Sequence, residues 1–129
     1  MSHDPSLPIS LVSRWTIRAG CEAAARRALA AVAKAVLENE AGTLIYTVHL
    51  PARRLDPRRV SVPVPCAEEV LFFEVYRDAQ AFEAHVNGAI FQSFLKESGA
   101  LFVAAGGASA PFIQVEFLDR VAGFVRTGA

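Results

Sequence analysis

Hydrophobic and polar residues alternate along this chain with two different periods, which predicts both strands and helices. Four segments are rich in β-branched and aromatic residues and alternate with a period of two, as strands do. These segments are residues 9–17, 43–50, 71–78 and 111–119. Two further regions place apolar residues at the three-to-four spacing of amphipathic helices. They are residues 21–38 and residues 79–102, the second of which is interrupted at Asn87-Gly88.

This order of elements, βαββαβ, predicts a ferredoxin-like α+β sandwich with an antiparallel four-stranded sheet and the helices on one face. The other face of the sheet would be uncovered in a single chain, with Phe72, Tyr76 and Phe112 among its apolar residues. A large apolar patch of this kind usually meets a partner. We therefore expect a homodimer that packs sheet against sheet as a dimeric α+β barrel, with a small-molecule cavity between sheet and helices or between the two sheets.

Length and composition are those of one domain. The chain has 129 residues, and we expect its core to span about residues 9–119, between tails at 1–8 and 120–129. Hydrophobic residues make up 53% of the chain, above the roughly 45–50% of soluble proteins. This excess agrees with an apolar surface that meets a partner chain, and the apolar segment 121–126 is a candidate to cross onto that partner.

Net charge, apolar run length and cysteine content indicate the partners and the compartment of the protein. The 13 Lys and Arg balance the 13 Asp and Glu, so no overall charge draws the chain to nucleic acid or to an anionic membrane. No apolar run approaches the roughly 20 residues of a membrane helix, and residues 1–8 lack the features of a signal peptide. We expect a cytoplasmic protein with two free thiols, Cys21 and Cys66.

The predicted strand 71–78 is the most informative segment of the chain. Its odd positions from Leu71 to Val75 are apolar and suit a core, whereas its even positions place Glu74 and Tyr76 in an otherwise apolar wall. A carboxylate in such a wall needs a partner or a raised pKa.

The same strand runs directly into a helix. Asp78 is predicted to cap the start of that helix, because its side chain can accept from the free N–H groups of the first turn. His85 lies on the second turn of the helix. A strand with a polar pair, followed at once by a helix with a histidine, is typical of a pocket wall.

Three segments together resemble the antibiotic biosynthesis monooxygenase domain, and most closely its bacterial quinol monooxygenase branch. They are Glu-Ala-Gly-Thr-Leu-Ile-Tyr at 40–46, Phe-Glu-Val-Tyr-Arg-Asp at 73–78 and Ala-Phe-Glu-Ala-His at 81–85. The resemblance runs from about Leu11 to about Phe117. It implies a dimeric α+β barrel that binds a hydrophobic, often aromatic substrate and oxidises it with O2 without flavin, haem or metal.

By this resemblance Glu74, Tyr76 and His85 fall on positions of the family's motif. The family often carries a second histidine one turn after the first, in a Ser-Pro-His-Phe-like segment. This chain has Gly-Ala-Ile-Phe at 88–91 instead. A mechanism that needs the second histidine is therefore not implied for this chain.

The haem-degrading members of the superfamily use an asparagine on the first strand, a tryptophan on the third and a histidine in the last helix. The corresponding positions here hold Ser13 or Arg14, Tyr76 and Phe94. The resemblance therefore disfavours haem degradation, because no histidine is placed to bind the haem iron in that way.

One catalytic hypothesis follows for these residues. His85 or His49 would be the general base, because an imidazole with a pKa near 6.5 can accept a phenolic proton at neutral pH. Glu74 would orient the base, and Tyr76 would donate a hydrogen bond to a substrate oxygen. Arg14 would stabilise the substrate anion.

Each of these residues also has a structural interpretation. A hydrogen bond between His85 and Glu74 would hold the fold, and His49 would be a solvated residue at a strand end. Arg14 would form a strand ion pair with Glu74 or Glu116.

Aromatic residues are the candidates for contact with the substrate, although the same spacing is also that of an ordinary core. They are Trp15, Tyr46, Phe72, Phe82, Phe91 and Phe94. The connection 51–68 is rich in proline and cannot form a central strand. It carries a basic cluster that would guide an anionic substrate, cover a pocket or be solvated, and that cluster is Arg53, Arg54, Arg58 and Arg59.

The leading functional hypothesis is a monooxygenase without cofactor that oxidises a hydroquinone or a polycyclic phenol with O2. Its partners would be this small aromatic substrate, O2 and a second copy of the chain. Two alternatives stay open. One is an isomerase of the same superfamily that works by proton transfer, and the other is a non-catalytic dimeric binder of a hydrophobic metabolite.

Overall fold

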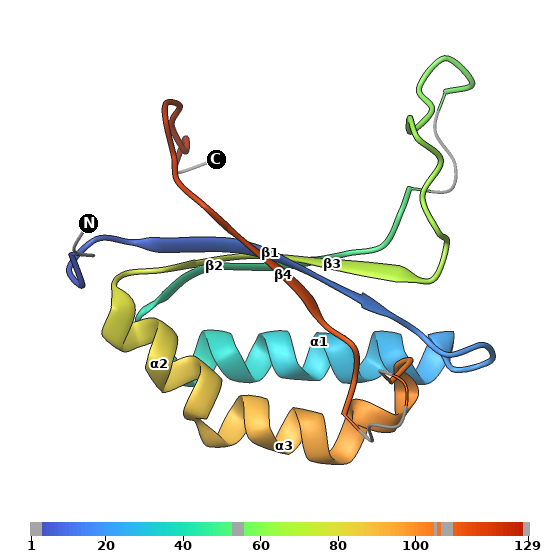
Figure 1. Cartoon of the computed structure of the whole chain (residues 1–129), viewed down its shortest axis with the longest axis horizontal. Helices are drawn as coiled ribbons and strands as arrows, with labels where there is room; N and C mark the ends of the chain where they lie inside the picture. The colour runs from blue at the N-terminus through green and yellow to red at the C-terminus, as the bar shows by residue number, and fades with distance from the viewer. Residues whose placement is uncertain (1–3, 53–55, 105, 107–109, 128–129) are drawn as a thin grey trace.

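The computed structural model describes residues 4–52, 56–104, 106 and 110–127, and within them the chain has the predicted βαββαβ order (Figure 1). The elements are β1 (Ile9–Thr16), α1 (Glu22–Asn39), β2 (Thr43–His49), β3 (Glu69–Tyr76), α2 (Ala79–Asn87), α3 (Ala89–Ser98), the short 3-10 helix η1 (Gly99–Leu101) and β4 (Gln114–Leu118). The second helical region is thus split into α2 and α3 at Gly88, as the sequence predicts. Among the described residues, no helix has both the length and the apolar character needed to cross a membrane.

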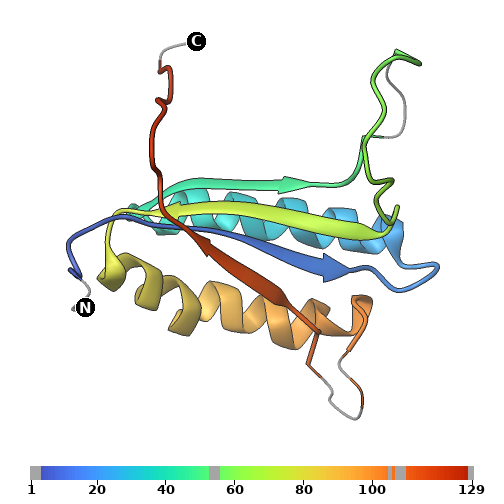
Figure 2. The same cartoon turned by 45° about the horizontal axis from the view of Figure 1, so that its top comes forward.

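The four strands form one antiparallel sheet in the order β2-β3-β1-β4. All three α-helices lie on one face of this sheet, and the other face, here called the open face, carries none (Figure 1). The β2–β3 connection and the C-terminal segment both extend away from the sheet on the open side (Figure 2). This arrangement confirms the ferredoxin-like α+β fold.

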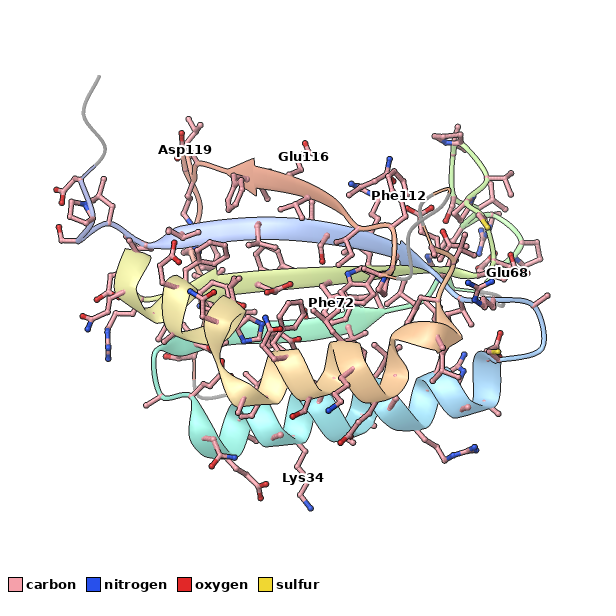
Figure 3. The ribbon with its side chains drawn as sticks, turned by 60° about the horizontal axis from the view of Figure 1, so that its bottom comes forward. Lys34, Glu68, Phe72, Phe112, Glu116 and Asp119 are labelled. Atoms are coloured by element: carbon pink, nitrogen blue, oxygen red, sulfur yellow. The ribbon has the colours of Figure 1, made fainter. Side chains whose placement is uncertain are left out.

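The register of β3 decides which of its side chains meet the helices. Glu74 lies opposite Leu11 of β1 and Tyr46 of β2, on the face that packs against the helices. Phe72, Glu74 and Tyr76 are only 2%, 7% and 0% exposed. In Figure 3 the side chain of Phe72 lies between the sheet and the helices.

Two predictions about the faces of this strand were therefore wrong. The face that runs from Leu71 to Val75 is the open face, not the one that meets the helices, and Phe72 and Tyr76 do not belong to the uncovered patch. The period of two fixes which residues share a face, but not which face the helices cover. The large rings of Phe72 and Tyr76 lie under the helices, where they bury more apolar surface than they would on the open face.

An aromatic cluster around Trp15 forms the core between sheet and helices. The ring centroids of Phe72, Phe91, Phe94 and Phe102 lie between 5.1 and 6.3 Å from that of Trp15. Helix α1 adds the buried aliphatic residues Ala25, Leu29, Val32 and Val36. Each buried aromatic ring removes about 150–250 Å² from water, so this cluster is the main source of hydrophobic stabilisation.

Local signals set where α2 begins and how closely it approaches the start of β2. Asp78 caps α2 as predicted, since its Oδ1 accepts from the N–H of Ala81 at 2.8 Å. Gly42 precedes β2 and lies so close to α2 that a Cβ atom there would be 2.6 Å from the Cβ of Ala81. A side chain at position 42 would therefore push the start of β2 away from α2.

Strand β4 is shorter than predicted. It begins at Gln114 rather than at residue 111, because the N–H of Phe112 donates to the carbonyl of Val103 at 2.9 Å instead of to β1. The preceding residues thus pair with the segment after α3.

The described part of the β2–β3 connection contains no regular helix or strand, as its prolines predict. Of the four arginines in its basic cluster, Arg53 and Arg54 lie outside the described residues. Arg58 and Arg59 both pair with Asp56, at 2.9 and 3.6 Å. Cys21 and Cys66 are free thiols.

Candidate functional site

Four residues form a buried polar cluster between the sheet and α2: Glu40, Glu74, Tyr76 and His85. The Tyr76 hydroxyl donates to Oε1 of Glu74. Nε2 of His85 lies 4.0 Å from the same Glu74 oxygen, which is longer than a hydrogen bond. Nδ1 of His85 lies 2.7 Å from Oε1 of Glu40. The fold thus brings together the three residues that the strand–helix motif singled out and adds a fourth.

Strand β3, helix α2 and the end of α1 position the four residues of the cluster. Glu74 and Tyr76 are two apart on β3 and therefore share a face. His85 is buried on the side of α2 that meets this face, with an exposure of 3%. Glu40 lies just after α1, where its N–H caps the helix by donating to the carbonyl of Val36. Its carboxylate then turns inward and accepts from the hydroxyl of Thr43 at 3.0 Å.

Glu40 is the residue that sequence reasoning did not assign to the site. It was visible as the first residue of the motif at 40–46, but nothing in its local pattern indicates a partner 45 positions later in the chain. The predicted hydrogen bond of His85 to Glu74 is replaced by this bond to Glu40.

When Glu40 is ionised, its bond to His85 selects the tautomer, because a carboxylate can only accept and Nδ1 must then donate. In the neutral imidazole Nε2 is then the nitrogen with the free lone pair, and it lies on the side of Glu74 and Tyr76. The arrangement is suited to a general base that acts through Nε2.

Burial controls the ionisation of the groups around this imidazole. Burial raises the pKa of Glu74 above its ordinary value, although hydrogen bonds from Tyr76 and Ser13 and the nearby His85 act in the opposite direction. Burial and the neighbouring Glu74 also raise the pKa of Tyr76 and of Tyr46 well above the usual range of a phenol. Both phenols therefore stay protonated at neutral pH.

Three of the predicted aromatic residues surround the buried cluster. The ring centroids of Tyr46 and Phe91 lie 5.4 and 5.2 Å from that of His85. The Phe82 ring lies 5.4 Å from that of Tyr76. The other three belong to the aromatic core, and these are Trp15, Phe72 and Phe94.

The remaining two candidates, Arg14 and His49, lie on the open face of the sheet. Arg14 forms the predicted ion pair with Glu116 at 3.5 Å and a second one with Glu69 at 3.3 Å. His49 is exposed, with its Nε2 2.9 Å from the hydroxyl of Thr47. Both line a groove of about 540 Å³ under the β2–β3 connection. The sheet therefore separates Arg14 and His49 from the buried cluster.

A second groove, here called the Glu40 groove, reaches the buried cluster from the surface. It has a volume of about 680 Å³ and lies between the start of β2 and helices α2 and α3. Its lining includes Glu40, Arg77, Ala84 and Ile90. Glu40 is thus both a wall of this groove and the hydrogen-bond partner of His85. Within the described residues, no three or more His, Cys, Asp or Glu side chains are arranged to hold a metal ion.

Comparison with known proteins identifies the family. The family model for antibiotic biosynthesis monooxygenase matches residues 8–97. The chain belongs to the antibiotic biosynthesis monooxygenase family. All four residues of the buried cluster lie within the matched segment, and the resemblance to this family found in the sequence is confirmed. No curated protein matches the chain.

Solved structures of similar fold agree with this family. PA3566 of Pseudomonas aeruginosa is 26% identical with a TM-score of 0.65, covering 93% of this chain and 100% of its own. Rv0793 of Mycobacterium tuberculosis is 19% identical with a TM-score of 0.64, covering 90% and 97%. A Caulobacter crescentus protein, provisionally described as an antibiotic biosynthesis monooxygenase, is 19% identical with a TM-score of 0.67, covering 92% and 93%. The last two show the fold alone.

The raised pKa of Glu74 predicts a specific pH dependence of stability in this family member. The folded state binds the Glu74 proton more tightly than the unfolded state does. The contribution of Glu74 to stability is therefore greatest below its ordinary pKa of about 4.5, and it is lost as pH rises through the raised pKa of the folded state. We expect Glu74→Gln, which carries no such proton, to gain stability relative to the native protein over that window. Urea unfolding of both proteins between about pH 4 and pH 8 measures the difference.

Glu38→Gln is the matched control, because it removes an exposed carboxylate on α1. Its difference from the native protein should change little over the same range. If the stability of Glu74→Gln relative to the native protein stayed constant or fell as pH rose, the assignment would be contradicted.

Proposed function

We propose that this protein is a monooxygenase that oxidises an electron-rich hydroquinone or polycyclic phenol with O2 and needs no cofactor. The observation that carries the proposal is the environment of His85. Its imidazole is buried among aromatic rings, held at Nδ1 by a carboxylate, and offers Nε2 as a base. Membership of the antibiotic biosynthesis monooxygenase family supports the reaction class.

In this chemistry the substrate supplies the electrons. Nε2 of His85 takes a phenolic proton, and the resulting phenolate gives one electron to O2 to form a substrate radical and superoxide. The two radicals join at a ring carbon as a peroxide, which takes up a proton. Its O–O bond and the C–H bond of the same ring carbon then break, and that hydrogen leaves with the outer oxygen as water. One oxygen atom stays in the product as a carbonyl and the other leaves in water, so the overall change is RH2 + O2 → RO + H2O.

The other residues of the buried cluster would orient the base. Tyr76 donates to Glu74 rather than pointing its hydrogen toward an open space, so we assign it the role of holding Glu74 beside Nε2. The substrate must reach an imidazole that is almost fully buried. Phe91 is only half-buried and packs on the imidazole ring, so it is the side chain we expect to move aside for the substrate.

Arg14 and His49 have no part in this proposal. They lie on the open face, on the other side of the sheet from Nε2. An oxyanion formed at His85 would be too far from Arg14 for a direct contact across the sheet.

A non-catalytic binder of a hydrophobic metabolite is the second candidate. The observation in its favour is the burial of His85, which is only 3% exposed, because a hydrophobic ligand held in a surface groove would not reach the base. Such a protein would be stabilised by its ligand without turnover.

Oxygen uptake separates these functions. Purified protein freed of metal is mixed with a panel of hydroquinones and polyphenols, and O2 consumption above autoxidation is recorded. We expect uptake in the native protein and a fall of about 10²-fold or more in His85→Gln, because the base is lost. His49→Ala, on the opposite face, is expected to keep the native rate.

Equal loss in both variants, or loss in His49→Ala alone, would contradict the assignment of the base. Ligand-induced stabilisation without O2 uptake would favour the binder. Conversion of a substrate that continues without O2 would favour the isomerase.

We also propose that the protein is a homodimer joined through the open face. The half-buried apolar side chains of Leu71 and Phe73 lie on this face. Val121 and Phe124 in the C-terminal segment are largely exposed in the single chain. This segment extends on the open side of the sheet (Figures 1 and 2), where a second copy would cover it.

Phe73→Arg tests this dimer, because it places a charge in the centre of the proposed interface. We expect the native protein to sediment as a dimer and Phe73→Arg as a folded monomer. Lys34→Glu is the control, since Lys34 points away from the sheet on α1 (Figure 3), and it should stay dimeric. A monomeric native protein, or a dimeric Phe73→Arg, would overturn this interface.

A further inference from the structure

We propose that Glu40 is a positioning residue for His85 and that, with the Glu40 groove, it forms a path for protons between the buried imidazole and solvent. This inference rests on the proposed role of His85 as the base. It gives the groove a function and adds proton transfer to a carboxylate that the oxidation chemistry uses only to hold the base.

The two nitrogens of His85 face different surroundings. Nε2 lies toward Glu74 and Tyr76 on β3, in the interior. Nδ1 lies against Glu40, which follows α1 at the edge of the fold. The substrate side and the Glu40 side are thus at opposite ends of one imidazole ring, so a proton taken up at one end can be balanced by a proton released at the other.

Glu40 is the member of the buried cluster that meets the surface. Its side chain is 16% exposed, against 4% for that of His85. Glu40 also lines the groove of about 680 Å³. The groove contains enough space for water beside this carboxylate. A proton on Glu40 therefore has a short route to solvent, whereas a proton on Nε2 is enclosed by rings.

The chain holds Glu40 firmly in this position. The Thr43 hydroxyl donates to its Oε1 at 3.0 Å, and the Thr43 N–H donates to its carbonyl at 3.0 Å. Gly42 allows this turn to press against Ala81 of α2, the helix that carries His85. The short Glu40–His85 distance is thus set by backbone packing and not by two flexible side chains alone.

The proton movements balance over one turnover. When Nε2 takes the phenolic proton, Nδ1 passes its own proton to Glu40, which releases it into the groove. When the peroxide loses water, Nε2 returns a proton to it, and Nδ1 recovers one from the groove through Glu40. The other titratable groups that face His85 are Glu74, Tyr46 and Tyr76, and α3 contributes the uncharged Phe91.

The first test needs no turnover. Nitrogen-15 NMR of the imidazole reports which nitrogen of His85 is protonated in the neutral form. We expect the Nδ1–H form in the native protein and a shift toward the Nε2–H form in Glu40→Ala, because Nδ1 then loses the oxygen that accepts its proton. Glu38→Gln should match the native protein. An unchanged tautomer in a folded Glu40→Ala would overturn the positioning role.

The second test uses O2 uptake with the best substrate of the panel. Glu40→Ala is expected to lose at least about tenfold in rate and to regain much of it with millimolar formate, which can enter the groove and replace the carboxylate. Thr43→Val keeps the carboxylate but loses its hydroxyl support, so it should show a smaller loss and no rescue. Should Glu40→Ala fail to fold, Thr43→Val still tests the path through its rate and its tautomer.

The outcomes separate this inference from the proposed function. Absence of uptake in the native protein would refute the monooxygenase, while the NMR result would still decide whether Glu40 positions His85. Uptake in the native protein with no loss in Glu40→Ala, or with a loss that formate does not restore, would overturn the proton path alone.

Discussion

The hydrogen bond between Glu40 and His85 is the interaction on which the rest of the site depends. It joins the end of α1 to the last turn of α2, at 2.7 Å and with the imidazole almost fully buried. Removing either partner would leave the other buried without its hydrogen bond, at a cost of about 1–3 kcal/mol or more if a charge remains. The same bond selects the tautomer of His85, so it links the stability of the fold to the chemistry of the site.

The sheet imposes the second constraint, because its two faces keep two sets of polar residues apart. The face under the helices holds Glu74 and Tyr76 beside the imidazole, in a setting where burial raises the pKa of both groups. The open face holds Arg14 and His49 in a groove that solvent reaches. The oxidation proposed at His85 would therefore take place among apolar walls, where bulk water does not solvate the phenolate.

Local patterns in the sequence predicted most of the fold. The period of two, the helical spacing and the glycine at position 88 fixed the order and approximate ends of the elements, and Asp78 could be recognised as a cap from its place alone. That Glu74, Tyr76 and His85 lie close together also followed, because strand and helix adjoin in the chain, although the hydrogen bond of His85 goes to Glu40. What could not be predicted depends on distant contacts.

Two examples show this limit. Alternation along β3 could not tell which face the helices cover, since that depends on how α1 and α3 pack against the whole sheet. The partner of His85 could not be found either, because Glu40 is 45 positions away and meets it only through the close approach at Gly42. Both features arise from tertiary packing between segments far apart in the chain, and no local pattern in the sequence indicates such contacts.

The central claim is that an electron-rich phenol meets Nε2 of His85, and anaerobic titration followed by nitrogen-15 NMR of the histidine side chains tests it most directly. Without O2 the bound substrate cannot turn over, so binding alone is observed. The account predicts that a polyphenol shifts the Nε2 resonance of His85 and leaves that of His49 unchanged. A polyphenol that shifts His49 and leaves His85 unaffected would place the ligand on the open face and contradict the account.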